Sequence, residues 1–363
     1  MAEERLGPDH PVASDSLHNL ALLYQEMGLY EQALPLYRRA LAIREVALGP
    51  DHPVTADSLH NLASLYQEMG LYEQALPLYR RALAIRQKRL GPEHPNEAYS
   101  LNNLAALYYE TGDYVAAEPL LWRALAIREK SLGLDHPDTA TSLNNLGSLY
   151  QAMGADAKAL PLYQRALAIK EKTLGPGHPD TARSLNNLAS LYRAIGDYAK
   201  AEPLYQQALA IREKTLGPRH PDTATSLNNL ALLYQAMGAY AEVEPLYQRA
   251  LTIKEQALGP GHPDTARSLN NLASFYQAGG AYAKALPLYQ RALTIMEKAL
   301  GTDNRETIEV LGNLALCYAD NGKKSEAVRT LEEVLHKAEK RFGQEDALTR
   351  RLRSTLARLK SEP

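Results

Sequence analysis

Apolar and polar residues alternate along this chain with the spacing of paired amphipathic helices. In residues 179–194 the apolar positions fall at i, i+3, i+4 and i+7, which places them on one face of an α-helix. They are Leu185, Leu188, Ala189 and Tyr192. A second apolar stripe follows, formed by Tyr198, Ala201, Tyr205, Ala208 and Leu209. The pattern predicts two helices joined by a short turn and contains no strand signal.

Residues typical of helix ends mark the boundaries of these two helices. Pro179 suits the first position of the first helix, because the amide hydrogen that proline lacks has no helical partner there. Gly196 predicts a left-handed stop, and Asp197 can cap the second helix. A Leu-Gly-Pro turn at residues 216–218 then ends the unit.

The helical pair is repeated along the whole chain. His-Pro recurs every 42 residues, at His10, His52, His94, His136, His178, His220 and His262. Repeats start near residues 6, 48, 90, 132, 174, 216, 258 and 300, and the eighth has Asn304-Arg305 instead of His-Pro. Such self-similarity predicts an all-α, right-handed superhelical solenoid of about eight helix-turn-helix repeats. We expect the solenoid over residues 1–343 and a charged amphipathic capping helix over 344–363.

A proline falls inside each of the first seven second helices, as Pro203 does in the fifth repeat. Within a helix it would remove a backbone hydrogen bond and bend the helix. We interpret it as a source of curvature, and the alternative is that the second helix begins after the proline.

The repeat resembles a known family. The spacing Leu17-x2-Leu20-Ala21-x2-Tyr24, followed by Gly28, Tyr30, Ala33, Tyr37 and Ala40, is similar to the tetratricopeptide repeat. The segment "ALAIREKTLGPRHPDTATSLNNLALLY" (208–234) resembles the repeats of kinesin light chains and of related bacterial proteins. The resemblance covers Leu6 to about Gly343. Local departures include Asp156, Val243 and Leu121, and no heptad coiled coil is seen, so the motor-linking role is not carried over.

This resemblance implies that the first helices line a concave, peptide-binding side. At about 100° per residue, Asn186 and Asn187 lie away from the apolar face of their helix. The second asparagine recurs as a ladder at Asn19, Asn61, Asn103, Asn145, Asn187, Asn229, Asn271 and Asn313. The first recurs at Asn102, Asn144, Asn186, Asn228 and Asn270, and is His18 and His60 in the first two repeats.

An amide side chain offers donors and an acceptor that match the backbone of an extended peptide. We therefore expect the ladder, with Asn144, Asn186 and Asn228, to bind a peptide main chain. The alternative is that each asparagine bonds the adjacent repeat and sets its register.

Variable positions on the same face are candidates for specificity. They comprise Tyr99, Tyr109, Arg183, Arg193 and Arg267. Acidic residues occupy equivalent positions at both ends of the array, so we expect a ligand to place acidic residues over the central arginines. The alternative is that these are ordinary solvated charges.

Composition excludes several classes of function. The formal net charge is only −2 and there is no basic block, which disfavours a nucleic-acid partner. The single cysteine, Cys317, excludes a disulfide framework. No apolar run is long enough for a membrane span, so we expect a cytoplasmic protein without a membrane partner. Histidines one repeat apart are too distant to share a metal ion, and no catalytic motif is found. No cofactor or enzyme activity is expected.

These observations favour a non-enzymatic scaffold that holds an extended protein or peptide segment. Two alternatives are the sensor array of a signalling ATPase and a self-associating scaffold. The first repeat lacks a preceding cap in the sequence, so we also expect that a homodimer can form through the N-terminal end.

Overall fold

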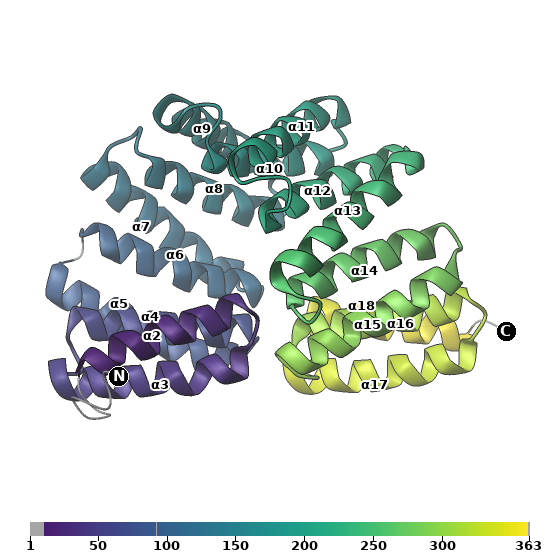
Figure 1. Cartoon of the computed structure of the whole chain (residues 1–363), viewed down its shortest axis with the longest axis horizontal. Coiled ribbons are helices and arrows are strands. Elements are labelled where there is room, and N and C mark those ends of the chain that lie inside the picture. The colour runs from purple at the N-terminus through teal and green to yellow at the C-terminus, as the bar shows by residue number, and fades with distance from the viewer. Residues whose placement is uncertain (1–10, 92, 362–363) are drawn as a thin grey trace. The chain divides into compact units, whose positions relative to one another are not determined.

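The computed structural model (Figure 1) describes residues 11–91 and 93–361. Within these ranges every regular element is an α-helix, and each repeat supplies a first helix (A helix) and a second helix (B helix). The A helices are α2 (Pro11–Glu26), α4 (Pro53–Glu68), α6 (Pro95–Glu110), α8 (Pro137–Ala152), α10 (Pro179–Ala194), α12 (Pro221–Met237), α14 (Pro263–Ala278) and α16 (Arg305–Asp320). The B helices are α3 (Tyr30–Leu48), α5 (Tyr72–Leu90), α7 (Tyr114–Leu132), α9 (Asp156–Leu174), α11 (Tyr198–Thr215), α13 (Tyr240–Leu258), α15 (Tyr282–Leu300) and α17 (Lys324–Phe342). A last helix, α18, spans Ala347–Ser361.

Neighbouring helices pack in chain order. Each A helix packs along its own B helix, as α8 does with α9, and within each unit the B helix then contacts the next A helix, as α9 does with α10 (Figure 1). At the C-terminal end α18 packs on α17. The expectation of an all-α solenoid built from helix-turn-helix repeats is confirmed.

Contacts divide the chain into two compact units, which the uniform repeat does not predict. The first unit is Met1–Pro218 and holds α2 to α11, and the second is Arg219–Pro363 and holds α12 to α18. Each unit therefore contains several complete helix pairs with a core of its own.

Each histidine before a proline in the described ranges caps an A helix. In α10 the Nδ1 atom of His178 accepts a hydrogen bond of 3.1 Å from the backbone amide of Asp180, and Pro179 is the first helical residue. The same bond forms at His52, His94, His136, His220 and His262. Asn304 caps α16 through its side-chain oxygen, at 2.8 Å from the amide nitrogen of Glu306. A side chain thus satisfies an amide that the first turn leaves unpaired. His10 lies outside the described residues.

The turn between the two helices is as expected. Gly196 has φ of 82°, in the left-handed region that favours glycine. Asp197 caps α11 by accepting from the amide of Lys200 at 3.3 Å. These two residues end one helix and start the next within a single short turn.

Pro203 lies inside a continuous helix. Since α11 begins at Tyr198, the proline is its sixth residue, and the alternative that the B helix begins later is wrong. Pro35, Pro77, Pro119, Pro161, Pro245 and Pro287 occupy the same place. The helix therefore continues although one amide hydrogen is missing from its backbone ladder.

The predicted apolar stripes form the core. Leu185, Leu188 and Tyr192 of α10 are buried, as is Tyr205 of α11. In the second unit one core runs from Ala231 to Leu359 and includes α18. Cys317 is buried there, and burial raises the pKa of its thiol to about 11, so it is an unreactive core residue.

Candidate functional site

The asparagine pair divides into two columns with different surroundings. We call the first residue of each pair the inner column and the second the outer column. Asn144 of the inner column is only 4% exposed, and Asn102 and Asn186 are also buried. The expectation that both asparagines lie on the open face is therefore wrong for these three residues, which are less than 9% exposed.

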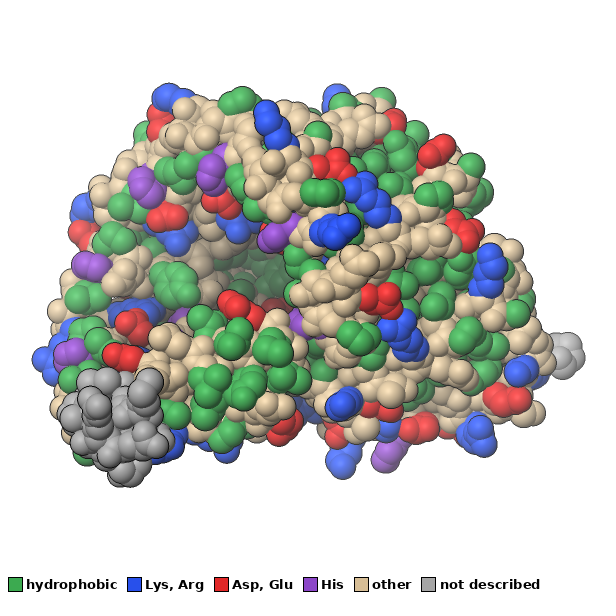
Figure 2. Space-filling view, in the orientation of Figure 1, with side chains coloured by type: hydrophobic (Ala, Val, Ile, Leu, Met, Phe, Trp, Pro, Cys, Tyr) green, Lys and Arg blue, Asp and Glu red, His purple; other side chains and the backbone are tan. Residues whose placement is uncertain are grey.

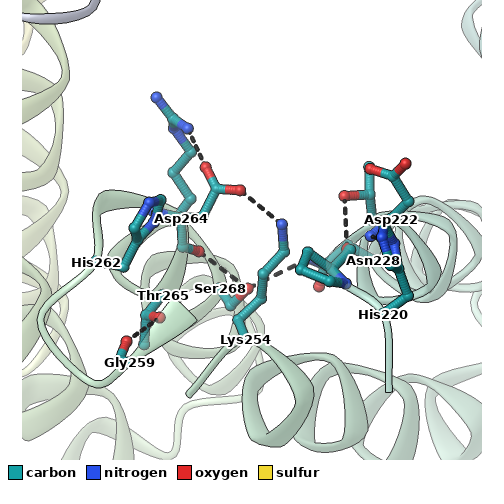
Figure 3. A network of polar contacts seen from close by, with 12 residues as sticks. His220, Asp222, Asn228, Lys254, Gly259, His262, Asp264, Thr265 and Ser268 are labelled. Carbon is teal, nitrogen blue, oxygen red and sulfur yellow. Dashed lines mark hydrogen bonds and ion pairs between the residues drawn. The ribbon is translucent and has the colours of Figure 1, made fainter. Parts of the chain in front are cut away.

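The inner column is buried because the next A helix packs over it. Asn144 donates from Nδ2 to Oγ of Ser184, one repeat further on, at 2.9 Å. Asn228 makes the same bond with Ser268 at 3.4 Å (Figure 3). A helical wheel of one A helix shows the face that packs on the B helix of the same repeat. It does not show the second face, which packs on the next A helix. The alternative interpretation, that an asparagine sets the register between repeats, fits the inner column.

The outer column is more accessible. Asn103, Asn145, Asn187, Asn229, Asn271, Asn313 and Asn61 are partly exposed, and Asn19 is exposed. Asn145 donates from Nδ2 to Oδ1 of Asn102 at 2.8 Å, and Asn313 donates to Asn270 at 3.0 Å. These bonds tie Asn145 and Asn313 to the preceding repeat, and both residues stay partly exposed.

The first two repeats replace the inner asparagine with histidine and keep this link. Nδ2 of Asn61 lies 3.3 Å from Nε2 of His18, and Nδ2 of Asn103 lies 3.3 Å from Nε2 of His60. Burial lowers the pKa of His60 to about 3. Its imidazole is therefore neutral near pH 7 and can accept the hydrogen bond from Asn103.

Two outer asparagines keep hydrogen-bonding capacity for a ligand. Asn103 uses Nδ2 for Tyr99 O, at 3.0 Å, and for His60, and Asn145 uses Nδ2 for Asn102. Among the residues that the structure describes, no hydrogen bond engages the side-chain oxygen of either amide. Both oxygens can therefore accept from a donor that approaches the A helices.

A pocket of about 350 Å³ opens beside these two amides. It is lined by residues of the A helices α6 and α8 and by Leu121 of α7. Its lining is Asn102, Asn103, Ala105, Ala106, Tyr109, Glu110, Leu121, Asn145 and Ser148. The volume is at the small end of ligand pockets, so it fits one long side chain better than a large cofactor.

The pocket arises from two substitutions in the third repeat. In the fourth repeat, Tyr163 of the B helix fills the equivalent space and donates to Gln151 of the A helix at 3.1 Å. The first and second repeats have the same tyrosine–glutamine pair, with bonds of 2.9 Å. In the third repeat the tyrosine is Leu121 and the glutamine is Tyr109, so the ring that fills this space in the first, second and fourth repeats is missing.

The two tyrosines proposed from the sequence have different surroundings. Tyr109 lines the pocket, and burial, with Tyr114 and Glu110 nearby, raises its pKa, so the phenol is neutral. The Tyr99 ring lies 4.6 Å from the ring of His60, and the guanidinium carbon of Arg86 lies 5.5 Å from it. Tyr99 is 45% exposed and adds an aromatic surface in the same repeat.

The three arginines have different surroundings, and only Arg183 and Arg193 belong to the same unit. Arg267 belongs to the second unit, where its guanidinium bonds both oxygens of Glu306, at 2.7 and 2.6 Å, and also Asp264. Arg183, in the first unit, lies 3.3 Å from Asp180. Two carboxylates neutralise Arg267, which makes it a poor partner for an acidic ligand. An acidic ligand near Arg183 and Arg193 stays a prediction.

Sequence reasoning missed a column of cations on the B helices. It consists of Arg44, Arg86, Arg128, Lys170, Arg212 and Lys254, all of them buried. Figure 3 shows Lys254 of α13 reaching Asp264 of α14, with 2.6 Å between Nζ and the carboxylate. Arg44 likewise donates to Ser58 of the next repeat at 2.7 Å. The signal was a basic residue every 42 positions, and the buried bonds show that it joins repeats.

Lys170 differs from the other cations in the column. Its Nζ is buried without a hydrogen-bond partner and lies 4.0 Å from a carboxylate oxygen of Asp180. Burial, together with the charge of Arg183, lowers its pKa to about 8. The amine of Lys170 is therefore buried without the hydrogen bonds that the arginines make at the same position.

Other kinds of site are not seen in the described ranges. No group of three or more His, Cys, Asp or Glu side chains there is arranged to hold a metal ion. None of the helices described combines the length and apolarity needed to cross a bilayer. Trp122, the one tryptophan, is partly exposed and donates to the hydroxyl of Tyr150 at 3.1 Å.

Apolar side chains gather over α2 (Figure 2). Leu20 and Leu23 are 41% and 51% exposed, whereas Leu62 and Leu65, their equivalents in α4, are buried. The equivalent leucines in the later repeats of the first unit are buried as well. The helix α2 therefore presents a packing face to solvent.

The stacked helix pairs place the chain among helical-repeat solenoids, and comparison with known proteins gives the family. The sequence model of the tetratricopeptide repeat matches residues 1–45, 12–88, 59–130, 101–172, 138–214, 180–256, 235–294 and 264–340. The chain belongs to the tetratricopeptide repeat family, whose members are generally protein-binding scaffolds. No functionally curated protein matches the sequence.

Solved structures similar to this chain include proteins of the kinesin-light-chain type. One is a structure of the nearly identical repeats of a kinesin light chain from Podosopora anserina. It is 32% identical in sequence, covers 56% of this chain and 97% of its own, and has a TM-score of 0.49. BtubC from P. vanneervenii is 25% identical over 65% of this chain and 92% of its own, with a TM-score of 0.48. A tetratricopeptide repeat protein from Parabacteroides merdae is 18% identical over 84% of this chain and 99% of its own, with a TM-score of 0.51, and supports the fold alone.

Proposed function

We propose that this chain is a non-enzymatic scaffold that holds an extended segment of a protein partner against the A helices of its first unit. The observation that carries the proposal is that Asn103 and Asn145 line an open pocket and keep side-chain oxygens that no described residue engages. An extended backbone exposes amide hydrogens at regular intervals, and these oxygens can accept them. The chemistry needed is binding alone.

Side chains around the two amides support this proposal. Tyr99 and Tyr109 provide partly exposed aromatic surface in the same repeat. Ala105 and Ala106 line the pocket with small side chains, which leave its space open. Such a surface combines apolar contact with a few fixed polar groups, as peptide-binding sites do. The buried inner asparagines support it indirectly, because they hold neighbouring A helices at a fixed spacing.

Selection from a displayed library of unstructured random peptides tests the proposal. We expect the wild-type chain to enrich a peptide family and the Asn103→Ala/Asn145→Ala variant to bind those peptides about tenfold or more weakly, because two hydrogen bonds are lost. The control is Glu171→Ala, which removes an exposed polar side chain from the B helix α9. Circular dichroism of each variant checks that its helices are intact.

Two outcomes would contradict the proposal. One is that no peptide is enriched on the wild-type chain. The other is that Glu171→Ala weakens binding as much as the double asparagine variant does. An alternative role in the regulation of a signalling ATPase gains no support from any described side chain.

Self-association is a second proposal, favoured by the open face of α2. Leu20 and Leu23 of one copy would be covered by another copy, which gives a homodimer through the N-terminal end. Sedimentation of wild type and of Leu20→Gln/Leu23→Gln distinguishes the states. A wild-type monomer at micromolar concentration would contradict the dimer.

A further inference from the structure

The pocket in the third repeat is rich in acceptors and contains no cation. Its nine lining residues include no Lys or Arg, and their single ionisable acid is Glu110. Glu110 sits in the last turn of α6 and accepts from Nε2 of Gln67 at 2.7 Å, which holds the carboxylate at the pocket wall. Asn103 and Asn145 line the same space, and among the described residues no hydrogen bond engages either amide oxygen. A ligand group that donates hydrogen bonds in several directions and carries positive charge complements this lining.

Four of the lining residues are apolar or aromatic. Leu121, Ala105 and Ala106 offer a surface on which an alkyl stem can lie. Tyr109 is neutral and offers a ring face and a hydroxyl. A volume of about 350 Å³ leaves room for a full-length side chain.

We infer that this pocket is a subsite for one arginine side chain of the bound segment. The inference rests on the proposed peptide-binding function. A guanidinium has five donors in a planar fork, enough to engage Glu110 and the two amide oxygens together, and its plane can stack on an aromatic ring. Lysine would bring the same charge with a compact, more strongly hydrated head.

The subsite is a property of the third repeat. The first, second and fourth repeats fill the equivalent space with Tyr37, Tyr79 and Tyr163, each bonded to a glutamine. The arginine subsite therefore fixes the register of the bound segment, since an otherwise repetitive row of amides would accept it at any step.

The experiment refills the pocket with the side chains of the other repeats. The variant Leu121→Tyr/Tyr109→Gln restores the tyrosine–glutamine pair, and Glu110→Gln removes only the charge. The control Glu68→Gln removes the equivalent charge one repeat earlier, outside the pocket lining. Peptides are selected on the wild-type chain from the same random library, and fluorescence anisotropy gives the Kd of one selected peptide and of its Arg→Ala and Arg→Lys forms.

On the wild-type chain we expect one arginine at a fixed position of the selected peptides. Its replacement by alanine should weaken binding about tenfold or more, and by lysine less. The alanine penalty should fall to about twofold or less on Leu121→Tyr/Tyr109→Gln and shrink on Glu110→Gln, but stay full on Glu68→Gln. Circular dichroism checks that each variant is folded. If Leu121→Tyr/Tyr109→Gln does not fold, Glu110→Gln alone tests the subsite.

The outcomes separate the subsite from the function. Selected peptides without a fixed arginine, or an alanine penalty unchanged on both pocket variants, would overturn the subsite and leave the scaffold function standing. A lysine preference would overturn the choice of guanidinium. Failure to select any peptide would overturn the proposed function and the subsite together.

Discussion

Single positions in this repeat chain have different surroundings although their neighbours in sequence are almost the same. Position 170 is an example. Arg44 bonds Ser58 and Asp15, and Lys254 bonds Asp264, while the amine of Lys170 has no hydrogen-bond partner among the described residues. The seventh repeat has Met296 at the same position. The site therefore tolerates an uncharged side chain of similar length.

Replacing Lys170 by methionine should stabilise the chain. The pKa of this amine is lowered from 10.5 to about 8 in the folded state, so the folded state binds the proton more weakly than the unfolded state does. The cost is complete below pH 8 and disappears as the pH rises from 8 to 10.5. We expect Lys170→Met to raise the unfolding free energy by about 2–3 kcal/mol at pH 7 and by less at pH 10, measured by urea denaturation.

The matched control is Lys254→Met. It removes an amine that is 2.6 Å from the Asp264 carboxylate, so it should lower the unfolding free energy by about 1–3 kcal/mol. Equal effects of the two substitutions would show that partner geometry does not matter at this position.

The sequence predicted the core residues and missed the inner asparagines. Leu185, Leu188 and Tyr192 could be assigned because one face of a helix carries them. Asn144 is polar, and its burial depends on the next repeat, which a helical wheel of one repeat leaves out. The buried cations were missed for the same reason. Polar residues that join repeats can be found only when neighbouring repeats are considered together.

At the scale of the helix, the prolines test how much a missing backbone bond costs. Pro203 is the sixth residue of α11, where an ordinary residue would donate to the carbonyl of Ala199. The last B helix, α17, has Arg329 at the equivalent position and spans 19 residues, as most of the proline-containing B helices do. Proline is thus not required for the length of a B helix.

Pro203→Ala should therefore stabilise the chain. One helical hydrogen bond is regained and the ring clash is removed, with an expected gain of about 1–3 kcal/mol in the unfolding free energy. Urea denaturation followed by circular dichroism measures it.

The reverse substitution, Arg329→Pro, provides the comparison and should cost a similar amount. A loss of stability in Pro203→Ala would mean that the helix is packed in a shape that only the proline gives.

At the scale of the whole molecule, the division into two units could not be read from a uniform 42-residue period. Repeats before and after Pro218 have the same spacing and the same turn. The pocket could not be predicted either. Its cause, Leu121 together with Tyr109, is visible in the sequence, but the resulting space depends on how the neighbouring tyrosines are placed. Periodicity thus predicts the common repeat, and the structure is needed for the exceptions.

The second unit should fold alone. Its core runs from Ala231 to Leu359 within residues 219–363, and α18 contributes Leu348, Leu352, Leu356 and Leu359 to it. We expect the fragment 219–363 to be helical by circular dichroism and to unfold cooperatively on heating.

Removing α18 gives the comparison for this fragment. The shorter fragment 219–343 should melt at least about 10 °C lower, because burial of several leucine side chains is lost. A fragment 219–363 without helical structure would show that the two units depend on each other for folding.

The bonds between inner asparagines and the serines of the following repeat have a consequence for how such a gene can change. Asn144 meets Ser184 through side chains that most repeats carry, so a copied unit would find matching contacts on both sides. The array can lengthen or shorten by duplication without inventing a new joint. A copy of the third repeat would, however, duplicate its pocket as well and give a bound segment two alternative registers.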